Sequence, residues 1–187
     1  MRTSRLLTVC TLAALAWCAL SAGQEATREL QMGTKTSDSG FAAALEVEVP
    51  ITDPQGAEKT LLESFDLLQE AVVQAGFTPL GTAQVVLQIS FDTRPQGAVP
   101  CQLLLPIIEQ PSEDDLNNEG DFAVVPVEAG KVAYTYHKGS FRELEVTFMR
   151  LFQYAVANDL EPAGYPRVIV YTPGDEAGVA EVQLPVK

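Results

Sequence analysis

The sequence predicts an α+β fold in which two strand–helix–strand–strand repeats share one antiparallel sheet. The chain contains two stretches in which apolar residues recur at helical spacing. Each comes after one stretch of the alternating pattern of a strand and before two more such stretches. The first half also aligns with the second when it is shifted by 83 positions (139 − 56 = 83), which places Phe65 on Phe148 and Leu68 on Leu151. One such unit cannot bury both its helix stripe and its sheet face alone. We therefore expect a pseudo-twofold pair, with both helices on one face of the sheet and a groove on the other.

The first 23 residues have the pattern of a secretory signal peptide. Two arginines precede a short apolar core from Leu6 to Trp17, and small residues surround an expected cleavage site near Ala22 or Gly23. The apolar core is too short to span a bilayer comfortably. We therefore expect an exported protein, periplasmic or secreted, with no stable membrane insertion once the signal is removed.

The mature chain is expected to start with a flexible leader over residues 24–40, which is polar and has no sustained period. A lipoprotein anchored through Cys18 is the alternative, but Trp17 stands where such a site needs a small residue. The mature chain keeps only Cys101, so no internal disulfide is expected. Because Cys101 lies in an apolar strand pattern, we interpret it as a buried, inert thiol.

The charge balance argues against several partners. The formal net charge is −13, and removal of the signal peptide makes it more negative. An acidic chain is a poor candidate for binding nucleic acid or anionic lipid, and it suits a cationic partner. The sequence leaves the oligomeric state open.

The first repeat is expected over residues 41–108. Residues 45–49 alternate strictly between apolar and acidic side chains, which predicts a strand. Apolar residues at helical spacing predict a helix over 61–76. Two further strands are expected over 85–91 and 101–108, the last interrupted near its end by a proline.

An acidic linker over 109–121 precedes the second repeat, which is expected over 122–187. A strand is predicted from Val132 to Tyr136. Ser140 stands three residues before Glu143, the spacing of a capping box.

Apolar residues from Leu144 to Ala155 then recur at helical spacing, and the helix is expected to end at Asn158. Strands over 168–171 and 180–186 complete the unit. This second repeat contains the sequence motifs that point to a known family.

The second repeat resembles a known family. The string VAYTYHKGSFRELEVTFMRLF, the strand with Tyr171 and the closing AEVQLPV are similar to the GyrI-like small-molecule-binding domain. This domain is the effector-binding module of multidrug-responsive transcription activators, and it shares its broad fold with SOUL-type haem-binding proteins. The resemblance is best over 122–187 and weaker over 45–108. It implies a pair of βαββ repeats and a central groove that takes amphipathic, often cationic, aromatic compounds.

Glu181 is the first candidate for a ligand-binding residue. Because Ala180 and Val182 belong to the apolar face of the closing strand, Glu181 is expected to point toward the groove. The resemblance places the family's ligand-facing carboxylate at this position. The competing interpretation is an ordinary solvated face of an edge strand. Gln102 holds the equivalent place in the first repeat, so we expect the groove charge to come from the second repeat.

Aromatic residues are the second group of candidates. Tyr171, Tyr134 and Tyr136 can supply apolar and π surface around a carboxylate, which together make a cation site. Packing in the core is the alternative for each tyrosine. Phe141, just after the turn, is expected to lie at the rim of the groove.

The sequence gives no support for a cofactor, a metal or a catalytic residue. His137 is the only histidine, and a lone histidine with one mature cysteine cannot form a usual zinc site. A haem reading through His137 is disfavoured because the GyrI-like pattern has a histidine in this turn anyway. There is no phosphate loop or nucleotide fingerprint, and no helix-turn-helix segment.

We therefore predict an exported, non-catalytic protein that holds an amphipathic or cationic small molecule in the groove between the repeats. Two alternatives stay open. One is a hydrolase of reactive small molecules, in which Glu181 orients or deprotonates water. The other is an interaction module of the cell envelope that binds a protein partner.

Overall fold

The computed structural model describes residues 31–50, 52–89, 97–116, 120–139, 143–172 and 178–187. The expected signal peptide over 1–23 lies outside these residues. So do the first part of the leader, the capping residue Ser140 and the candidate Phe141.

The described residues form one eight-stranded sheet in the order β1-β6-β8-β7-β3-β4-β2-β5, and each neighbouring pair of strands is antiparallel. Together with the helices, this sheet confirms the predicted α+β class. The strands are β1 Met32–Thr36, β2 Gly40–Pro50, β3 Gln84–Leu87, β4 Ala98–Ile107, β5 Ala123–Val127, β6 Lys131–Gly139, β7 Arg167–Thr172 and β8 Gly178–Pro185.

The element order repeats along the chain. One half reads β2, α2, β3, β4, and the other reads β6, α4, β7, β8. In the sheet, β3 and β7 are neighbours at the centre, β4 and β8 flank them, and β2 and β6 come next. Each half therefore has the predicted strand–helix–strand–strand order. The pseudo-twofold rotation between the halves stays a prediction.

Helix α2 spans Pro54–Gln74 and helix α4 spans Leu144–Ala157. Proline is suited to the first turn of α2 because the amide that it lacks has no partner there. After α2, Gly76 adopts φ 88, a left-handed conformation that stops the helix. Asn158, where the sequence predicted the end of this helix, is the C-cap of α4. The linker carries a third, short helix, α3, over Glu113–Leu116. Within the part of the chain that the structure describes, no helix is long and apolar enough to span a bilayer.

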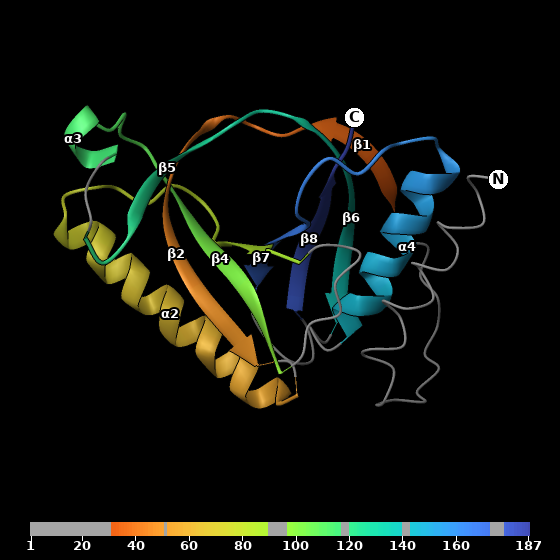
Figure 1. Cartoon of the computed structure of the whole chain (residues 1–187), viewed down its shortest axis with the longest axis horizontal. Helices are drawn as coiled ribbons and strands as arrows, with labels where there is room; N and C mark the ends of the chain where they lie inside the picture. The colour runs from red at the N-terminus through yellow and green to blue at the C-terminus, as the bar shows by residue number, and fades with distance from the viewer. Residues whose placement is uncertain (1–30, 51, 90–96, 117–119, 140–142, 173–177) are drawn as a thin grey trace.

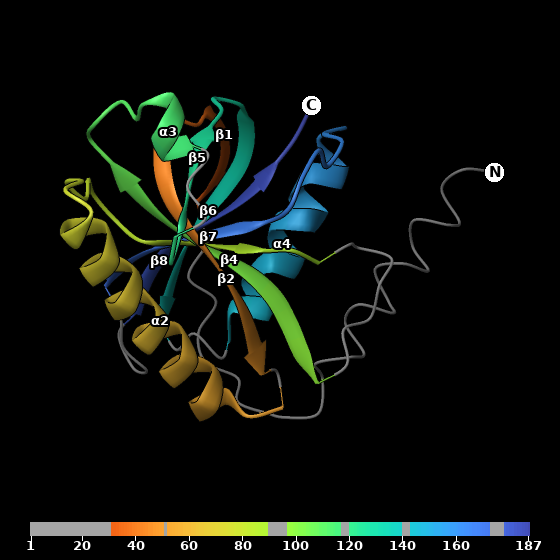
Figure 2. The same cartoon turned by 60° about the vertical axis from the view of Figure 1, so that its left-hand side comes forward.

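Both long helices cover the same face of the sheet (Figures 1 and 2). Leu68 and Val72 of α2 pack with buried side chains such as Leu103 of β4. Leu151 of α4 packs with Val182 of β8. Further helix-facing residues of the core are Ala43, Val85, Cys101, Leu105, Val124, Ala133, Val168, Ala180 and Leu184. Along each strand, the alternate side chains point to the opposite face of the sheet, which we call the distal face.

One expectation about the leader is wrong. Met32–Thr36, which we expected to be flexible, forms β1 and pairs with β6 at the edge of the sheet. Its sequence, MGTKT, lacks apolar alternation, so the pattern carried no strand signal. The strand forms because β6 offers a free edge whose backbone groups need partners.

Candidate functional site

The distal face is defined by two cross-strand rows of residues. The first row runs Tyr136, Glu181, Ile169, Gln84, Leu104, Ala44, and the second runs Tyr134, Gln183, Arg167, Val86, Gln102, Glu46. Because side chains alternate between faces along a strand, all of these residues lie on the side of the sheet opposite the helices. The two rows place four predicted candidates, Glu181, Tyr134, Tyr136 and Gln102, on one surface, with Tyr134 and Tyr136 on β6 next to Glu181 on β8.

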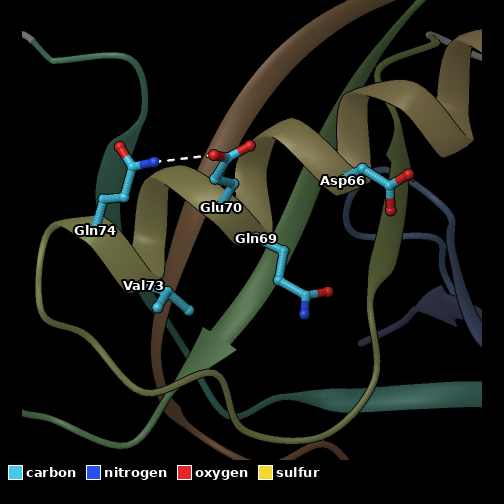
Figure 3. Close-up of a pocket in the computed structure, with 5 residues that line it drawn as sticks. All are labelled: Asp66, Gln69, Glu70, Val73 and Gln74. Carbon is cyan, nitrogen blue, oxygen red and sulfur yellow. Dashed lines mark hydrogen bonds between the residues drawn. The ribbon is translucent and has the colours of Figure 1, made fainter.

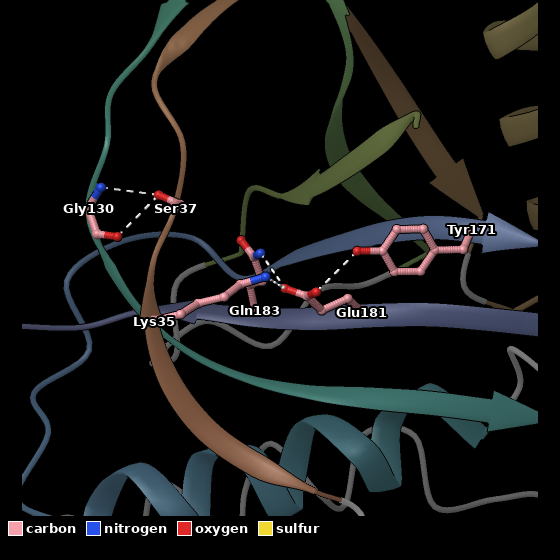
Figure 4. A network of polar contacts seen from close by, with 6 residues as sticks. All are labelled: Lys35, Ser37, Gly130, Tyr171, Glu181 and Gln183. Atoms are coloured by element: carbon pink, nitrogen blue, oxygen red, sulfur yellow. Dashed lines mark hydrogen bonds and ion pairs between the residues drawn. The ribbon is translucent and has the colours of Figure 1, made fainter. Parts of the chain in front are cut away.

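Glu181 lies in the middle of a polar network on this face (Figure 4). Its side chain is fully buried. Lys35 Nζ lies 2.6 Å from Glu181 Oε1. Gln183 Nε2 donates a hydrogen bond of 2.6 Å to the same oxygen, and the Tyr171 hydroxyl donates one of 3.1 Å to Glu181 Oε2. Glu181 therefore points toward the distal face as predicted, but it is not the solvated side chain of an edge strand.

These contacts keep the Glu181 carboxylate ionised. Burial raises its pKa, but the hydrogen bond from Gln183 and the ammonium of Lys35 lower it more, and the pKa lies below the ordinary value of 4.5. The hydrogen bond between Tyr171 and Glu181 has the opposite effect on the pKa of Tyr171. Burial and the charge of Glu181 raise the pKa of Tyr171 to about 12, so this tyrosine stays a neutral donor. Glu181 thus carries a negative charge at neutral pH, and the Lys35 ammonium is paired with it.

The three candidate tyrosines surround this carboxylate rather than packing in the core. Tyr136 is 42% exposed and Tyr171 is 47% exposed. The rings of Tyr134 and Tyr136 meet edge to face with centroids 5.9 Å apart, and those of Tyr136 and Tyr171 are 6.5 Å apart. Tyr136 is the direct cross-strand partner of Glu181. A carboxylate bordered by aromatic rings has the composition of a cation site.

Gln102 lies on the same face but far from Glu181. Strands β7 and β3 separate the two residues, and three strand spacings of about 4.8 Å amount to roughly 14 Å. The Gln102 amide donates a hydrogen bond of 2.7 Å to Glu46 Oε1, and Gln88 donates to the same oxygen at 3.2 Å. The first repeat therefore has a carboxylate of its own on this face, the exposed Glu46. The tyrosine in its cross-strand row, Tyr134, lies at the other end of that row.

An apolar cluster occupies the first-repeat side of the distal face. Its buried members are Ala42, Ala44 and Leu104. Val86, Val125 and Val127 pack against them. The half of the face on β4, β2 and β5 therefore carries an apolar cluster beside the Glu46–Gln102 pair, and the half on β6, β8 and β7 is polar and bordered by tyrosines.

Two acceptor atoms on this face have no partner. Gln183 Oε1 and Gln84 Oε1 are buried and accept no hydrogen bond within the described ranges. An unsatisfied buried acceptor is costly, by about 1–3 kcal/mol. Arg167 lies between their strands in the register, and burial lowers its pKa from the usual value.

Two open surface hollows lie elsewhere, along α2. One is lined by Asp66, Gln69, Glu70, Val73 and Gln74 (Figure 3). The second is lined by residues between Gln55 and Asp66 on the same helix. Both are bordered by α2 alone, and the Gln74 amide donates to Glu70 across the first. A hollow along one helix encloses little of a ligand. The depth of the predicted groove on the distal face stays a prediction.

Cys101 and His137 belong to the helix-facing side. Burial raises the pKa of the Cys101 thiol to about 12, with a smaller effect from Glu48 and Glu46, so it is not a thiolate at neutral pH. His137 Nδ1 lies 2.9 Å from the hydroxyl of Thr147 on α4, with both residues buried. No cluster of three or more metal-ligating side chains is present among the residues described.

Comparison with family models and with curated proteins gives no match for this chain. Solved structures do match. The C-terminal domain of EcmrR superposes with a TM-score of 0.70 at 15% identity, over 86% of this chain and 99% of that one. The chain has the GyrI-like fold.

Two further structures share the GyrI-like fold. An uncharacterised conserved protein from Listeria innocua gives a TM-score of 0.60 at 12% identity, over 84% of this chain and 92% of that one. SAV2435, solved with bound tetraphenylphosphonium, gives 0.50 at 10% identity, over 86% of this chain and 94% of that one. At these identities the likeness establishes the fold and leaves the ligand of this chain to be argued from its own residues.

Sequence reasoning missed one member of the site. Lys35 comes from the segment expected to be flexible, and it supplies the cation that faces Glu181. Its sequence context gave no signal, because a lysine in a polar stretch is usually a solvated side chain. The contact depends on the pairing of β1 with β6, which joins residues about a hundred positions apart in the chain.

Proposed function

We propose that this protein binds a small amphipathic or cationic molecule on the distal face, outside the cytoplasm, without a catalytic role. The observation that carries the proposal is the Glu181 site: a buried, ionised carboxylate bordered by Tyr134, Tyr136 and Tyr171. A cation over aromatic faces beside a desolvated carboxylate is bound more strongly than at an exposed site. The export part of the proposal is supported by the signal-peptide pattern over residues 1–23.

The amphipathic part of the proposal comes from the apolar half of the face. A ligand whose cation lies at Glu181 can place its apolar part toward Val86 and Leu104, where the side chains are aliphatic. Small-molecule sites generally combine such apolar surface with a few placed polar groups.

Hydrolysis is the second candidate, and one observation favours it. The Tyr171 hydroxyl lies 3.1 Å from the Glu181 carboxylate, so a second polar group is within hydrogen-bond reach of a candidate base. However, a carboxylate whose pKa is lowered is a weaker base, so the environment of Glu181 suits charge pairing better than proton abstraction from water.

The proposal predicts that tetraphenylphosphonium raises the melting temperature of the mature protein in a concentration-dependent way. A ligand that binds the folded state stabilises it by about 2.7 kcal/mol at 100 times its Kd. Thermal unfolding is followed with increasing tetraphenylphosphonium, and with the neutral triphenylphosphine oxide as the matched control. Stabilisation by the cation alone supports the proposal. Equal shifts from both compounds, or none from a panel of aromatic cations, would refute the claim of a cation site.

A further inference from the structure

We propose that Lys35 is a built-in competitor for the cation site: its ammonium occupies the place of a ligand's positive charge and must leave before a cation binds. The inference rests on the proposed function, because it concerns the regulation of the same site. It assigns a role to β1, which belongs to the polar N-terminal segment of the mature chain rather than to either repeat.

The Lys35 ammonium makes the two contacts that define a cation site. Its Nζ lies 2.6 Å from Glu181 Oε1 and 5.0 Å from the centre of the Tyr134 ring. In the register, Lys35 is level with Val132 on β6, so its side chain extends along and across β6 to reach Glu181 on β8 (Figure 4). A short primary alkylammonium would have the same chemistry as this side-chain end. The site is therefore occupied by an internal cation.

The occupation also cancels the charge of the site. With Lys35 in place, Glu181 is paired with one cation and two neutral donors, Gln183 and Tyr171. An external cation then gains little from Glu181 unless it replaces the ammonium. If Lys35 leaves without a replacement, a fully buried carboxylate is left without a counter-charge, which is strongly unfavourable. Departure of Lys35 and arrival of a cation are thus coupled.

The attachment of β1 is suited to release. Among the strands that the structure describes, β1 pairs with β6 alone, and none of the side chains from Met32 to Thr36 is buried. The Lys35 side chain is 37% exposed, so it can turn into solvent without disturbing the core. Edge segments with few buried contacts open at low free-energy cost. The side chain, or the strand with it, can therefore exchange with a ligand.

Two contacts keep β1 close to the site when no ligand is bound. At the end of the strand, Ser37 and Gly130 are joined by a backbone bond of 2.8 Å and by two bonds of 3.1 Å through the Ser37 hydroxyl. In the middle, Gly33 lies against Tyr134: a Cβ on Gly33 would stand 3.2 Å from the ring carbon Cε1. The glycine lets the strand lie close over the ring that Lys35 also covers. The competitor is thus tethered, which raises its effective concentration at the site.

The test compares Lys35→Met with the wild-type chain. Methionine keeps an unbranched apolar side chain but removes the positive charge. Lys59→Met is the matched control, because Lys59 is an exposed lysine on α2 whose loss changes the net charge equally. The Kd of tetraphenylphosphonium is measured by titration calorimetry for the wild type, both single variants and Lys35→Met/Glu181→Gln.

The inference predicts that Lys35→Met lowers the Kd at least about tenfold, which is 1.4 kcal/mol, that Lys59→Met leaves it unchanged, and that the added Glu181→Gln abolishes the gain. If the wild type binds and Lys35→Met binds equally or more weakly, the inference is wrong while the proposed function stands. If neither protein binds, the proposed function fails and the inference fails with it.

A second measurement uses the wild-type chain and does not depend on the stability of a variant. Acylation of Lys35 by an amine-reactive reagent is followed by peptide mass spectrometry, with Lys59 as the internal reference. A saturating concentration of tetraphenylphosphonium should speed acylation of Lys35 several-fold and leave Lys59 unchanged, because the displaced ammonium is no longer paired. Unchanged or slower acylation of Lys35 under saturation contradicts displacement.

Discussion

Replacing Glu181 by glutamine is expected to weaken the binding of tetraphenylphosphonium by about 30-fold or more, a loss of at least roughly 2 kcal/mol. The substitution keeps the size of the side chain and its ability to accept a hydrogen bond from Tyr171. It removes the charge that a bound cation would face in a buried environment, where Coulomb energies are large. Titration calorimetry of both proteins under identical salt gives the ratio of the two dissociation constants.

Glu46→Gln is the matched control for this prediction. Glu46 is a carboxylate on the same face of the sheet, it accepts bonds from Gln88 and Gln102, and it is exposed. Its loss should change the Kd less than about threefold, because an exposed charge is screened. If Glu46→Gln weakens binding as much as Glu181→Gln does, the cation responds to the overall acidity of the protein and not to a site.

The same carboxylate sets the pH dependence of binding. The pKa of Glu181 is lowered below 4.5, so its ionised form persists from neutral pH down past that value. Affinity for a cation should therefore be constant above this pH and fall only as the pH drops further, toward the folded-state pKa. Glu181→Gln should lack this acid-dependent fall. A loss of affinity that begins near neutral pH would point to another titrating group.

Leu103→Ala is expected to lower the free energy of unfolding by about 2–5 kcal/mol, the range for truncating a fully buried leucine. Leu103 is 0% exposed and lies on β4, the strand that links the edge of the first repeat to the centre of the sheet. It stands opposite Val85 on one side and Leu45 on the other, and it faces Leu68 of α2 in the same cluster. Urea unfolding followed by circular dichroism measures the change.

Leu62→Ala serves as the control for core packing. Leu62 lies on α2 but is 46% exposed, so its truncation should cost less than about 1 kcal/mol. A cost for Leu103→Ala similar to that for Leu62→Ala would mean that the sheet face against α2 is not a packed core.

The strand periodicities explain why much of the site could be predicted. Alternation fixes which face each side chain takes once one apolar face is assigned, so Glu181 and Gln183 could be placed opposite Val182 from the sequence alone. The phase of Tyr134 and Tyr136 was ambiguous, because Val132 shares it and looks like a core residue. The register resolves this: Tyr136 pairs with Glu181 and is 42% exposed.

The rest could not be predicted because it depends on long-range pairing. No local pattern marks Met32–Thr36 as a strand, and its position next to β6 is decided by the free edge that β6 offers. Lys35 therefore could not be connected with Glu181 before the sheet order was known. Similarly, β7 and β3 stand between Gln102 on β4 and Glu181 on β8, and β4 places Glu46 on β2 one strand further away. The internal repeat predicted equivalent places for Gln102 and Glu181, but it could not give the distance between them across the sheet.

The most direct test of the central claim is a crystal structure of the mature protein with tetraphenylphosphonium. We predict the phosphonium on the distal face, in contact with Glu181 and with the rings of Tyr136 and Tyr171, and with the Lys35 ammonium turned away from the carboxylate. A cation seated instead in the acidic hollow on α2 beside Asp66 and Glu70, with Lys35 still paired to Glu181, would contradict the account.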